Sequence, residues 1–230
     1  MNIALIVAAG NGTRMGEVEK PKQFLLVNDK PLLIYSLETF NNHQLIDAII
    51  VVTSKEYIGL VKDLVKQYQL SKVVDVVLGG STRQESVHNG LMKAKEVAAN
   101  IDNDIVLIHD AARPLVSQEI ISNNILECEK YDAVTTVINA SDTIVHSKNS
   151  DTVNDVPLRK ELYQSQTPQS FKLSLILSAH DSAKVKKLDD VTDDAQLVLL
   201  LNKEVHLVKG DKRNFKITTF DDLLMLKALL

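Results

Sequence analysis

The sequence predicts an α/β domain built on a mainly parallel sheet with helices on both faces. Two observations support this class. Short, almost entirely apolar runs recur along the first half of the chain, and between them lie longer stretches with apolar residues three and four positions apart. Fully apolar runs are typical of parallel strands that are covered on both sides. Strands and helices that alternate in this way are joined by right-handed crossovers into one parallel sheet.

The first half of the chain supplies these strands and helices in turn. The predicted strands are Ile3–Val7, Ala48–Val52, Val73–Leu78 and Ile105–Ile108. The predicted helices are Pro31–Phe40, Tyr57–Tyr68 and Ser86–Ala99. Open parallel sheets bind their ligands beyond the carboxyl ends of the strands. The residues that follow each strand are therefore the first candidates for a functional site.

The pattern changes after Ala133, where three short strands with polar interruptions are predicted with no helix between them. They are Ala133–Ile138, Asp142–Val145 and Thr152–Val156. We expect an arm at about residues 134–158 that projects from the sheet, and a loop folded onto its own domain is the alternative. The later elements are helices near Leu173–Ala183 and Asp193–Leu201, a strand at Glu204–Val208 and a closing helix after Thr218. Residues 1–230 are predicted to form a single domain, since no repeat or low-complexity linker divides them.

The composition is that of an ordinary soluble globular protein. Its 26 basic and 30 acidic residues leave a net charge of −4, so we expect neither nucleic acid nor a membrane as a partner. Cys128 is the only cysteine, which excludes an intrachain disulfide and a cysteine-based zinc site and indicates plain packing. The apolar N-terminal run is too short to span a membrane and has no basic segment before it, so we expect a buried strand and a cytoplasmic protein.

Glycines follow the first and the third predicted strands. Gly10, Gly12 and Gly16 come after the first, and Gly79–Gly80 come after the third. Glycine lets backbone amides approach phosphate oxygens closely, so we predict a phosphate-binding loop, with ordinary strand-exit turns as the alternative. The loop is neither a Walker loop, which needs a lysine after its last glycine, nor a dinucleotide fingerprint, because its GxGxxxG spacing is one residue too long.

Basic residues accompany this loop. Arg14 lies within it, and Lys22 follows in the segment Pro21–Phe24. A guanidinium can hold phosphate oxygens in bidentate fashion, and lysine adds a compact point charge. Lys216, in the segment Asn214–Thr219, is a third candidate cation. Together they could neutralise a triphosphate and stabilise a departing pyrophosphate, although a lone arginine or lysine is usually a solvated surface residue.

The fourth strand ends in the motif HDAARP. Asp110 is well placed at that strand end to hold Mg²⁺, which prefers oxygen ligands and bridges phosphates. Asp193–Asp194 offers a second acidic point, with a helix N-cap as the alternative. We expect His109 to be a hydrogen-bonded structural residue. The polar stretch from residue 159 to 171 could line a phosphate pocket through Arg159, Thr167 and Gln169.

The chain resembles the cytidylyltransferases that make 4-diphosphocytidyl-2-C-methylerythritol from methylerythritol 4-phosphate, and their sister group that acts on ribitol 5-phosphate for wall teichoic acid. The resemblance runs almost end to end, through AAGNGTRMG, PKQF, GGSTRQESV, HDAARP, LYQSQTPQSF, TDDA and NFKITT. The first and fourth motifs are the most specific. The resemblance implies a Rossmann-like nucleotide-diphospho-sugar transferase fold and transfer of CMP from CTP with release of pyrophosphate. It also implies Mg²⁺ and a homodimer built through the arm.

The resemblance also assigns roles to the residues at matching positions. The nucleotide would be bound by Ala8, Ala9, Gly10, Gly12, Gly80, Ser81, Arg83 and Ser86. The catalytic residues around the triphosphate would be Arg14, Lys22 and Lys216. The acceptor would meet Asp110, Arg113, Thr143, Arg159 and Thr167. In this family the residues that resemble Thr143 and Arg159 come from the opposite subunit, so the dimer would be needed for activity.

The motifs divide over the acceptor. AAG, GGxxRxxSV, HDAARP and TDDA look more like the methylerythritol group, whereas Ser141–Val145 and Leu162–Gln166, with Tyr163 in place of the usual Trp, look more like the ribitol group. We expect methylerythritol 4-phosphate, hence isoprenoid precursor synthesis, with ribitol 5-phosphate and teichoic acid synthesis as the alternative. A sugar-1-phosphate nucleotidyltransferase is a third possibility. A non-catalytic nucleotide-binding regulator is a fourth, but it would not need the charged residues.

Overall fold

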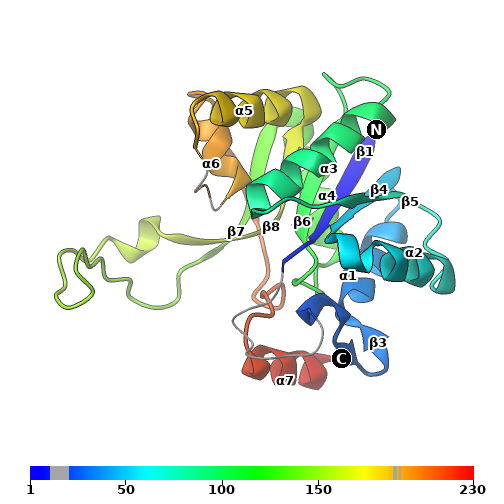
Figure 1. The fold of residues 1–230 in the computed structure, drawn as a ribbon. Helices are drawn as coiled ribbons and strands as arrows, with labels where there is room; N and C mark the ends of the chain where they lie inside the picture. The colour runs from blue at the N-terminus through cyan, green and yellow to red at the C-terminus, as the bar shows by residue number, and fades with distance from the viewer. Residues whose placement is uncertain (11–20, 189–190, 192) are drawn as a thin grey trace.

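A seven-stranded sheet forms the centre of the molecule, in the strand order β5-β4-β1-β6-β8-β7-β9 (Figure 1). The computed structural model describes residues 1–10, 21–188, 191 and 193–230. The parallel half of the sheet consists of β1 (Asn2–Ala8), β4 (Ala48–Thr53), β5 (Val73–Leu78) and β6 (Ile105–Asp110). All four correspond to the strands predicted from apolar runs, which confirms those predictions.

Helices cover both faces of the sheet, as predicted. One face carries α1 (Leu32–Asn41), α2 (Ile58–Gln67) and α4 (Gln118–Tyr131). The other carries α3 (Arg83–Val97), α5 (Leu173–Val185) and the short α6 (Asp194–Leu199). Residues of β1 alternate between the two apolar cores: Ile6 packs into the first, and Leu5 into the second. Cys128 is buried on α4, in agreement with a packing role.

A small third layer closes the carboxyl side of the molecule. It contains the hairpin of β2 (Leu26–Val27) and β3 (Lys30–Pro31) and the last helix, α7 (Phe220–Leu229). Val27, Leu32 and Leu226 are buried together between these elements. Short 3-10 turns at Lys22–Phe24, Lys55–Tyr57 and Arg159–Glu161 complete the chain. None of the helices described is long and apolar enough to cross a membrane.

The segment after residue 133 differs from the prediction. Ala133–Asn139 is β7, a strand of the main sheet that pairs with β8 and with β9 (His206–Lys209), and is not part of an arm. The next two predicted strands are absent from this described region apart from one isolated bridge, His146 to Asp155. Residues 141–156 are all exposed, and a two-stranded hairpin alone is marginal in water. The segment projects away from the sheet as an irregular loop (Figure 1).

Strand β8 (Tyr163–Lys172) was missed by the sequence analysis, which treated this stretch as a polar pocket wall. It runs antiparallel to β6 and β7 and lies between them. Most of its buried residues are polar, and neighbouring side chains satisfy them: Gln169 Nε2 donates to Thr135 Oγ1 at 2.8 Å, and Ser170 Oγ donates to Asn124 Oδ1 at 3.0 Å. A strand buried through hydrogen bonds carries no apolar alternation, so the usual signal was lacking.

Two glycines in helices provide a matched test of how closely α3 packs against the sheet. A Cβ at Gly90 in α3 would meet Leu5 and lie 2.8 Å from Val52 Cγ2, whereas a Cβ at Gly59 in α2 would meet nothing within 4 Å. We expect Gly90→Ala to lower the free energy of unfolding by about 1–3 kcal/mol through overpacking. Gly59→Ala should raise it by up to about 1 kcal/mol, because alanine favours the helix. Urea unfolding of both variants tests the difference, and equal effects would contradict the close approach of α3 to the sheet.

Candidate active site

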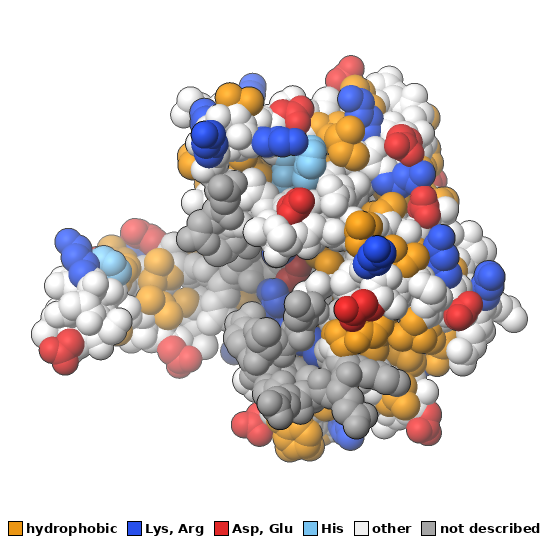
Figure 2. Space-filling model, viewed as in Figure 1, with side chains coloured by type: hydrophobic (Ala, Val, Ile, Leu, Met, Phe, Trp, Pro, Cys, Tyr) orange, Lys and Arg blue, Asp and Glu red, His pale blue; other side chains and the backbone are white. Residues whose placement is uncertain are grey.

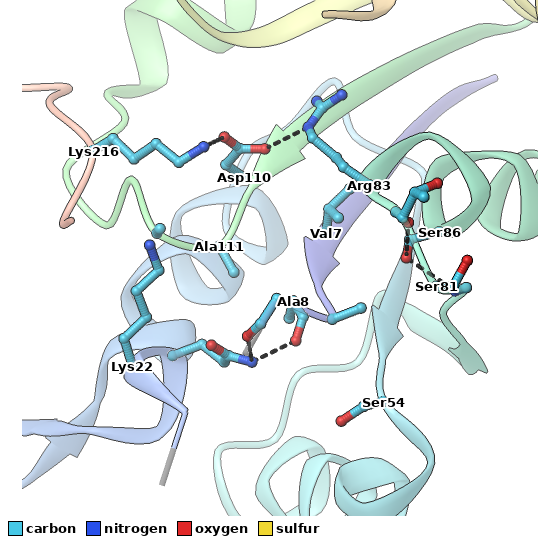
Figure 3. A pocket seen from close by; sticks show the side chains of 16 residues that line it. Val7, Ala8, Lys22, Ser54, Ser81, Arg83, Ser86, Asp110, Ala111 and Lys216 are labelled. Carbon is cyan, nitrogen blue, oxygen red and sulfur yellow. Dashed lines mark hydrogen bonds and ion pairs between the residues drawn. The ribbon is translucent and has the colours of Figure 1, made fainter. Parts of the chain in front are cut away.

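A cavity of about 500 Å³ opens at the carboxyl ends of the parallel strands (Figure 3). Its lining comes from the ends of β1 and β6, the loop after β5, the start of α3, the turn after residue 20 and the segment before α7. The lining residues are Val7, Ala8, Ala9, Gly10, Lys22, Gln23, Ser54, Gly80, Ser81, Thr82, Arg83, Ser86, Asp110, Ala111, Ala112 and Lys216. All of the predicted nucleotide-binding residues that the structure describes are in this set. Gly12 and Arg14 lie outside the described residues.

Gln23 holds the end of β1 in place. Its amide Nε2 donates to the carbonyl oxygens of Ala8 at 2.7 Å and Gly10 at 3.1 Å, and its side chain is buried. These contacts fix the backbone where the glycine loop leaves the sheet. No role was predicted for Gln23, although its place beside Lys22 in the same motif was a signal. Lys22 Nζ donates to the Ile217 carbonyl at 2.9 Å, which ties this turn to the segment before α7.

The loop after β5 is ordered by hydrogen bonds to the first turn of α3. Thr82 caps the helix by accepting from Glu85 N, and Ser86 Oγ accepts from Gly80 N at 3.0 Å and donates to Thr82 O at 2.8 Å. A Cβ at Gly80 would collide with the Glu85 side chain, so this position requires glycine. The predicted residues Gly80, Ser81 and Ser86 therefore form one rigid wall of the cavity.

Asp110 lies between two cations at the end of β6 (Figure 3). Its Oδ2 is 2.7 Å from Lys216 Nζ, and its Oδ1 is 3.4 Å from Arg83 Nε. Burial alone would raise the pKa of Asp110, but the charges of Arg83, Lys216 and Arg113 outweigh it and hold that pKa well below its usual range. Asp110 is thus ionised at neutral pH and fixes the direction of two predicted ligand-binding cations. Lys22 also lines this cavity, so the structure brings Lys22, Lys216 and Asp110 together.

His109 and Thr167 support Asp110 from beneath. Asp110 N donates to Thr167 Oγ1 at 3.0 Å, and Thr167 Oγ1 lies 3.1 Å from His109 Nδ1. His109 Nε2 lies 3.1 Å from the Arg113 carbonyl, which can only accept, so in the neutral ring Nδ1 is the acceptor for the threonine hydroxyl. The structural role expected for His109 is confirmed. Thr167 is buried behind Asp110 and lines neither cavity described here, unlike the acceptor-binding position expected for it.

His109 predicts a pH dependence of stability. Burial lowers its pKa from 6.5 to about 4, so the folded state stays neutral where the unfolded state takes up a proton. The free energy of unfolding should therefore fall as the pH drops from about 6.5 to about 4, by up to about 3 kcal/mol. Urea unfolding at several pH values should show a shallower fall in His109→Gln. His146→Asn, in the exposed loop, should keep the parental slope, and equal slopes in all three proteins would refute the assignment.

A second cavity of about 330 Å³ adjoins the first and shares Lys216 with it. Its lining residues are Arg113, Ile138, Asn139, Ser141, Gln164, Ser165, Gln166, Lys212, Phe215 and Lys216. Arg113 is held by bonds from Nη1 to the Asn214 carbonyl, at 2.8 Å, and from Nη2 to the Ser165 carbonyl, at 3.2 Å. Its Nε is buried and has no hydrogen-bond partner among the residues described. Lys212, Gln164 and Asn139 were not singled out from the sequence.

The remaining predicted site residues lie elsewhere. Thr143 and Arg159 belong to the projecting loop and line neither cavity of their own chain; Arg159 Nη1 donates to the Ser141 carbonyl at 3.3 Å. Asp193 is the N-cap of α6 and accepts from Ala195 N at 2.8 Å, so the helix-cap alternative was correct. Asp194 pairs with Arg83. Within the described ranges, no cluster of three or more His, Cys, Asp or Glu side chains could hold a metal ion.

Known proteins resemble this chain over almost its whole length. A family model described as 2-C-methyl-D-erythritol 4-phosphate cytidylyltransferase matches residues 2–230. A ribitol-5-phosphate cytidylyltransferase of Lactiplantibacillus plantarum is 40% identical over 230 residues, which cover 100% of this chain and 98% of the relative. One from Streptococcus agalactiae is 39% identical over 229 residues, covering 100% of this chain and 95% of that protein.

Solved structures of the same family share the fold. The 4-diphosphocytidyl-2C-methyl-D-erythritol synthase of Anaerococcus prevotii superposes with a TM-score of 0.82 at 31% identity, over 99% of this chain and 95% of that one. The 2-C-methyl-D-erythritol 4-phosphate cytidylyltransferase of Francisella tularensis also has a TM-score of 0.82, at 29% identity over 100% and 99% of the two chains. The predicted Rossmann-like transferase fold is confirmed, and the findings favour an enzyme over a non-catalytic regulator. The chain belongs to the 2-C-methyl-D-erythritol 4-phosphate cytidylyltransferase family and is a CTP-dependent cytidylyltransferase.

Proposed function

We propose that this cytidylyltransferase transfers CMP from CTP to ribitol 5-phosphate, with methylerythritol 4-phosphate as the second candidate acceptor. The observation that carries the proposal is the pair of adjoining cavities that share Lys216. The first is bounded by the ends of β1 and β6 and by the glycine-containing loop after β5, which suits a nucleoside triphosphate. The second is smaller and suits a sugar-alcohol phosphate. Lys216 lies where the two reacting phosphates meet.

The lining of the second cavity favours ribitol 5-phosphate. It contains amide, hydroxyl and cationic side chains from Asn139, Gln164 and Lys212, which suit an unbranched polyol with many hydroxyls. Methylerythritol 4-phosphate carries a methyl branch, for which Ile138 and Phe215 are the apolar lining residues. The ribitol-5-phosphate enzymes noted above are 39–40% identical to this chain, and the methylerythritol enzymes among the solved structures 29–31%. The lining of the second cavity and the sequence identities both favour ribitol 5-phosphate over methylerythritol 4-phosphate.

The proposed reaction is a single in-line displacement. An oxygen of the acceptor phosphate forms a bond to the α-phosphorus of CTP, and the bond from that phosphorus to the bridging oxygen breaks as pyrophosphate leaves. The nucleophile is already an anion, so no general base is needed. Lys22 and Lys216 neutralise the charge that builds up on the phosphates and hold them in line, and Asp110 directs Lys216. Arg14, outside the described residues, is proposed as a third cation on the triphosphate.

Magnesium is proposed as the cofactor, with Asp110 as its protein ligand. Each carboxylate oxygen can accept about two contacts, and each oxygen of Asp110 has one cation beside it, so a lone pair remains on both. Mg²⁺ is commonly held by one or two carboxylates together with substrate phosphates, which fits this donor set. When bound, the ion supplies Lewis-acid neutralisation of the phosphoryl oxygens. Chelation with EDTA should therefore abolish pyrophosphate release, and added Mg²⁺ should restore it.

The projecting loop is proposed to build a homodimer and to carry Thr143 and Arg159 into the partner's site. Apolar side chains gather on this loop (Figure 2). Among the residues of the loop, Val145, Val153 and Leu158 are 54%, 60% and 61% exposed. Apolar side chains exposed in this number mark an interaction surface in a soluble protein. On the face shown in Figure 2 basic and acidic side chains are interspersed, without the basic surface that nucleic acid needs. A cytoplasmic location remains part of the proposal.

A pyrophosphate-release screen tests the acceptor. CTP, UTP, GTP and ATP are each paired with ribitol 5-phosphate and with methylerythritol 4-phosphate, and kcat/KM is measured for every pair. We expect CTP with ribitol 5-phosphate to exceed every other pair by about tenfold or more. A preference for methylerythritol 4-phosphate would select the second candidate. Faster turnover with UTP or GTP than with CTP would contradict the nucleotide assignment.

A further inference from the structure

Arg83 is held between two carboxylates, only one of which belongs to the cavity. Its Nε lies 3.4 Å from Asp110 Oδ1, and its Nη1 donates to Asp194 Oδ2 at 2.7 Å. Arg83 lines the first cavity and its side chain is 26% exposed, whereas the side chain of Asp194 is 2% exposed and lines neither cavity. The bond to Asp194 is the shorter of the two, so Asp194 sets where the guanidinium lies.

Asp194 is itself fixed by contacts with strand β8 and helix α5. Its backbone N–H donates to Gln169 Oε1 of β8 at 3.1 Å. The same glutamine donates to Asp193 Oδ1 at 2.8 Å, which holds the first turn of α6 against the strand. On the far side, Asp194 Oδ1 lies 3.3 Å from Nε2 of the buried His180, without the alignment of a hydrogen bond. The carboxylate therefore has little freedom to move, and it transmits that rigidity to Arg83.

The pKa shifts of Asp194 and Arg83 agree with a fixed ion pair between them. Burial would raise the pKa of Asp194, but the charge of Arg83 and the neighbouring His180 outweigh it, so the pKa is lowered and the carboxylate stays ionised. Burial acts in the opposite direction on Arg83, and the carboxylates of Asp194 and Asp110 more than compensate, so its pKa is raised. A charged hydrogen bond in a buried place is among the stronger contacts available to a side chain. An arginine held in this way offers its remaining N–H groups to a ligand without first having to be ordered.

We propose that Asp194 is a positioning residue for the nucleotide, which acts through Arg83 and never touches the substrate. The proposal rests on the placement of CTP in the first cavity. Asp194 fixes the guanidinium of Arg83, a residue that lines the cavity, while Asp110 exchanges its contact with Arg83 when ligands arrive. Loss of Asp194 leaves Arg83 present but mobile, which weakens CTP binding and leaves the acceptor site intact.

Binding of CTP by calorimetry, without acceptor, tests this directly. We expect Asp194→Asn, which keeps the side-chain shape but removes the charge, to raise the Kd for CTP about tenfold. In steady state the KM for CTP should rise similarly, whereas the KM for the acceptor changes by less than about threefold. Asp181→Asn removes one acidic charge from the exposed face of α5 and should leave the Kd unchanged. An unchanged Kd in Asp194→Asn would overturn the proposal.

A double-mutant cycle separates positioning from general loss of structure. In an Arg83→Ala background the same Asp194→Asn change should alter the Kd by less than about twofold, because its effect passes through the arginine. Full additivity of the two changes would overturn the proposal. If Asp194→Asn does not fold, Asp194→Glu is the second variant, because it keeps the charge but displaces it. A parental Kd for CTP in Asp194→Glu would also overturn the proposal. Wild-type protein that binds CTP but uses neither acceptor would refute the proposed acceptor and leave this inference standing, whereas failure to bind CTP would refute both.

Discussion

Lys216→Ala is expected to lower kcat for pyrophosphate release by about 10²-fold or more, the cost seen when one donor to a developing anion is removed. Lys216 lines both cavities, and Asp110 holds its ammonium at 2.7 Å, so its charge sits between the two cavities in which the triphosphate and the acceptor phosphate are proposed to bind. Stabilisation of this kind exists mainly in the transition state. The loss should therefore appear in kcat, with a smaller change in the KM for CTP.

Steady-state pyrophosphate release under saturating CTP is the measurement. Lys22→Ala should behave in the same way, since Lys22 lines the first cavity. Lys203→Ala, which removes an exposed lysine, is the matched control and should keep the parental kcat. Parental turnover in Lys216→Ala would remove this residue from the chemistry, and parental turnover in Lys22→Ala would do the same for Lys22.

Asp110→Asn is expected to lower the free energy of unfolding by about 2–3 kcal/mol. It leaves Arg83 and Lys216 without their shared carboxylate, and breaking a buried ion pair from one side typically costs about 3–5 kcal/mol. The lower figure allows for the partial exposure of Lys216, 33% of its side chain. Activity should fall as well, because Lys216 loses the group that directs it. Asp102→Asn, an exposed carboxylate, should be nearly neutral in both assays.

The pH dependence of that difference distinguishes an ion pair from simple packing. The folded-state pKa of Asp110 is depressed, so its contribution is fully present above the unfolded pKa of about 3.9 and is lost as the pH falls through the folded value. The stability gap between parent and Asp110→Asn should therefore be constant above about pH 5 and shrink below about pH 4. A gap that does not change with pH would mean that the charge of Asp110 contributes nothing to stability.

The parallel half of the molecule could be predicted because its signals are local. Ile105–Ile108 is apolar throughout and is followed at once by His109 and Asp110, so both the strand and the acid at its end could be read from the chain. The lysines were predicted from their neighbours in short motifs. Their convergence on one cavity depends on neighbouring strands that end at the same height in the sheet. Val7 near the end of β1, for example, pairs with both Val52 and Asp110.

In the other half, β7 and β9 were predicted as strands, but β8 was not, because its burial depends on partners distant in sequence. From the sequence, Thr167 and Gln169 were expected to line a pocket. In the structure, His109 and Asp193 are their hydrogen-bond partners. The acidic pair at the start of α6 reads as a cap or a metal site, and only the fold brings Asp194 within 2.7 Å of Arg83, 111 positions away. Polar burial leaves no periodic pattern, so neither β8 nor the positioning role of Asp194 had a sequence signal.

The insertion of β8 between β6 and β7 has a consequence for how the protein is made. On a ribosome, residues 1–110 emerge with four parallel strands, and the open edge of β6, a strand that is buried in the complete fold, then carries unpaired backbone groups. Its antiparallel partner, residues 163–172, is translated only after α4, β7 and the long irregular loop. Until then the exposed edge of β6 can pair with another chain. This enzyme should therefore depend on chaperones during synthesis more than a protein whose neighbouring strands are consecutive in sequence.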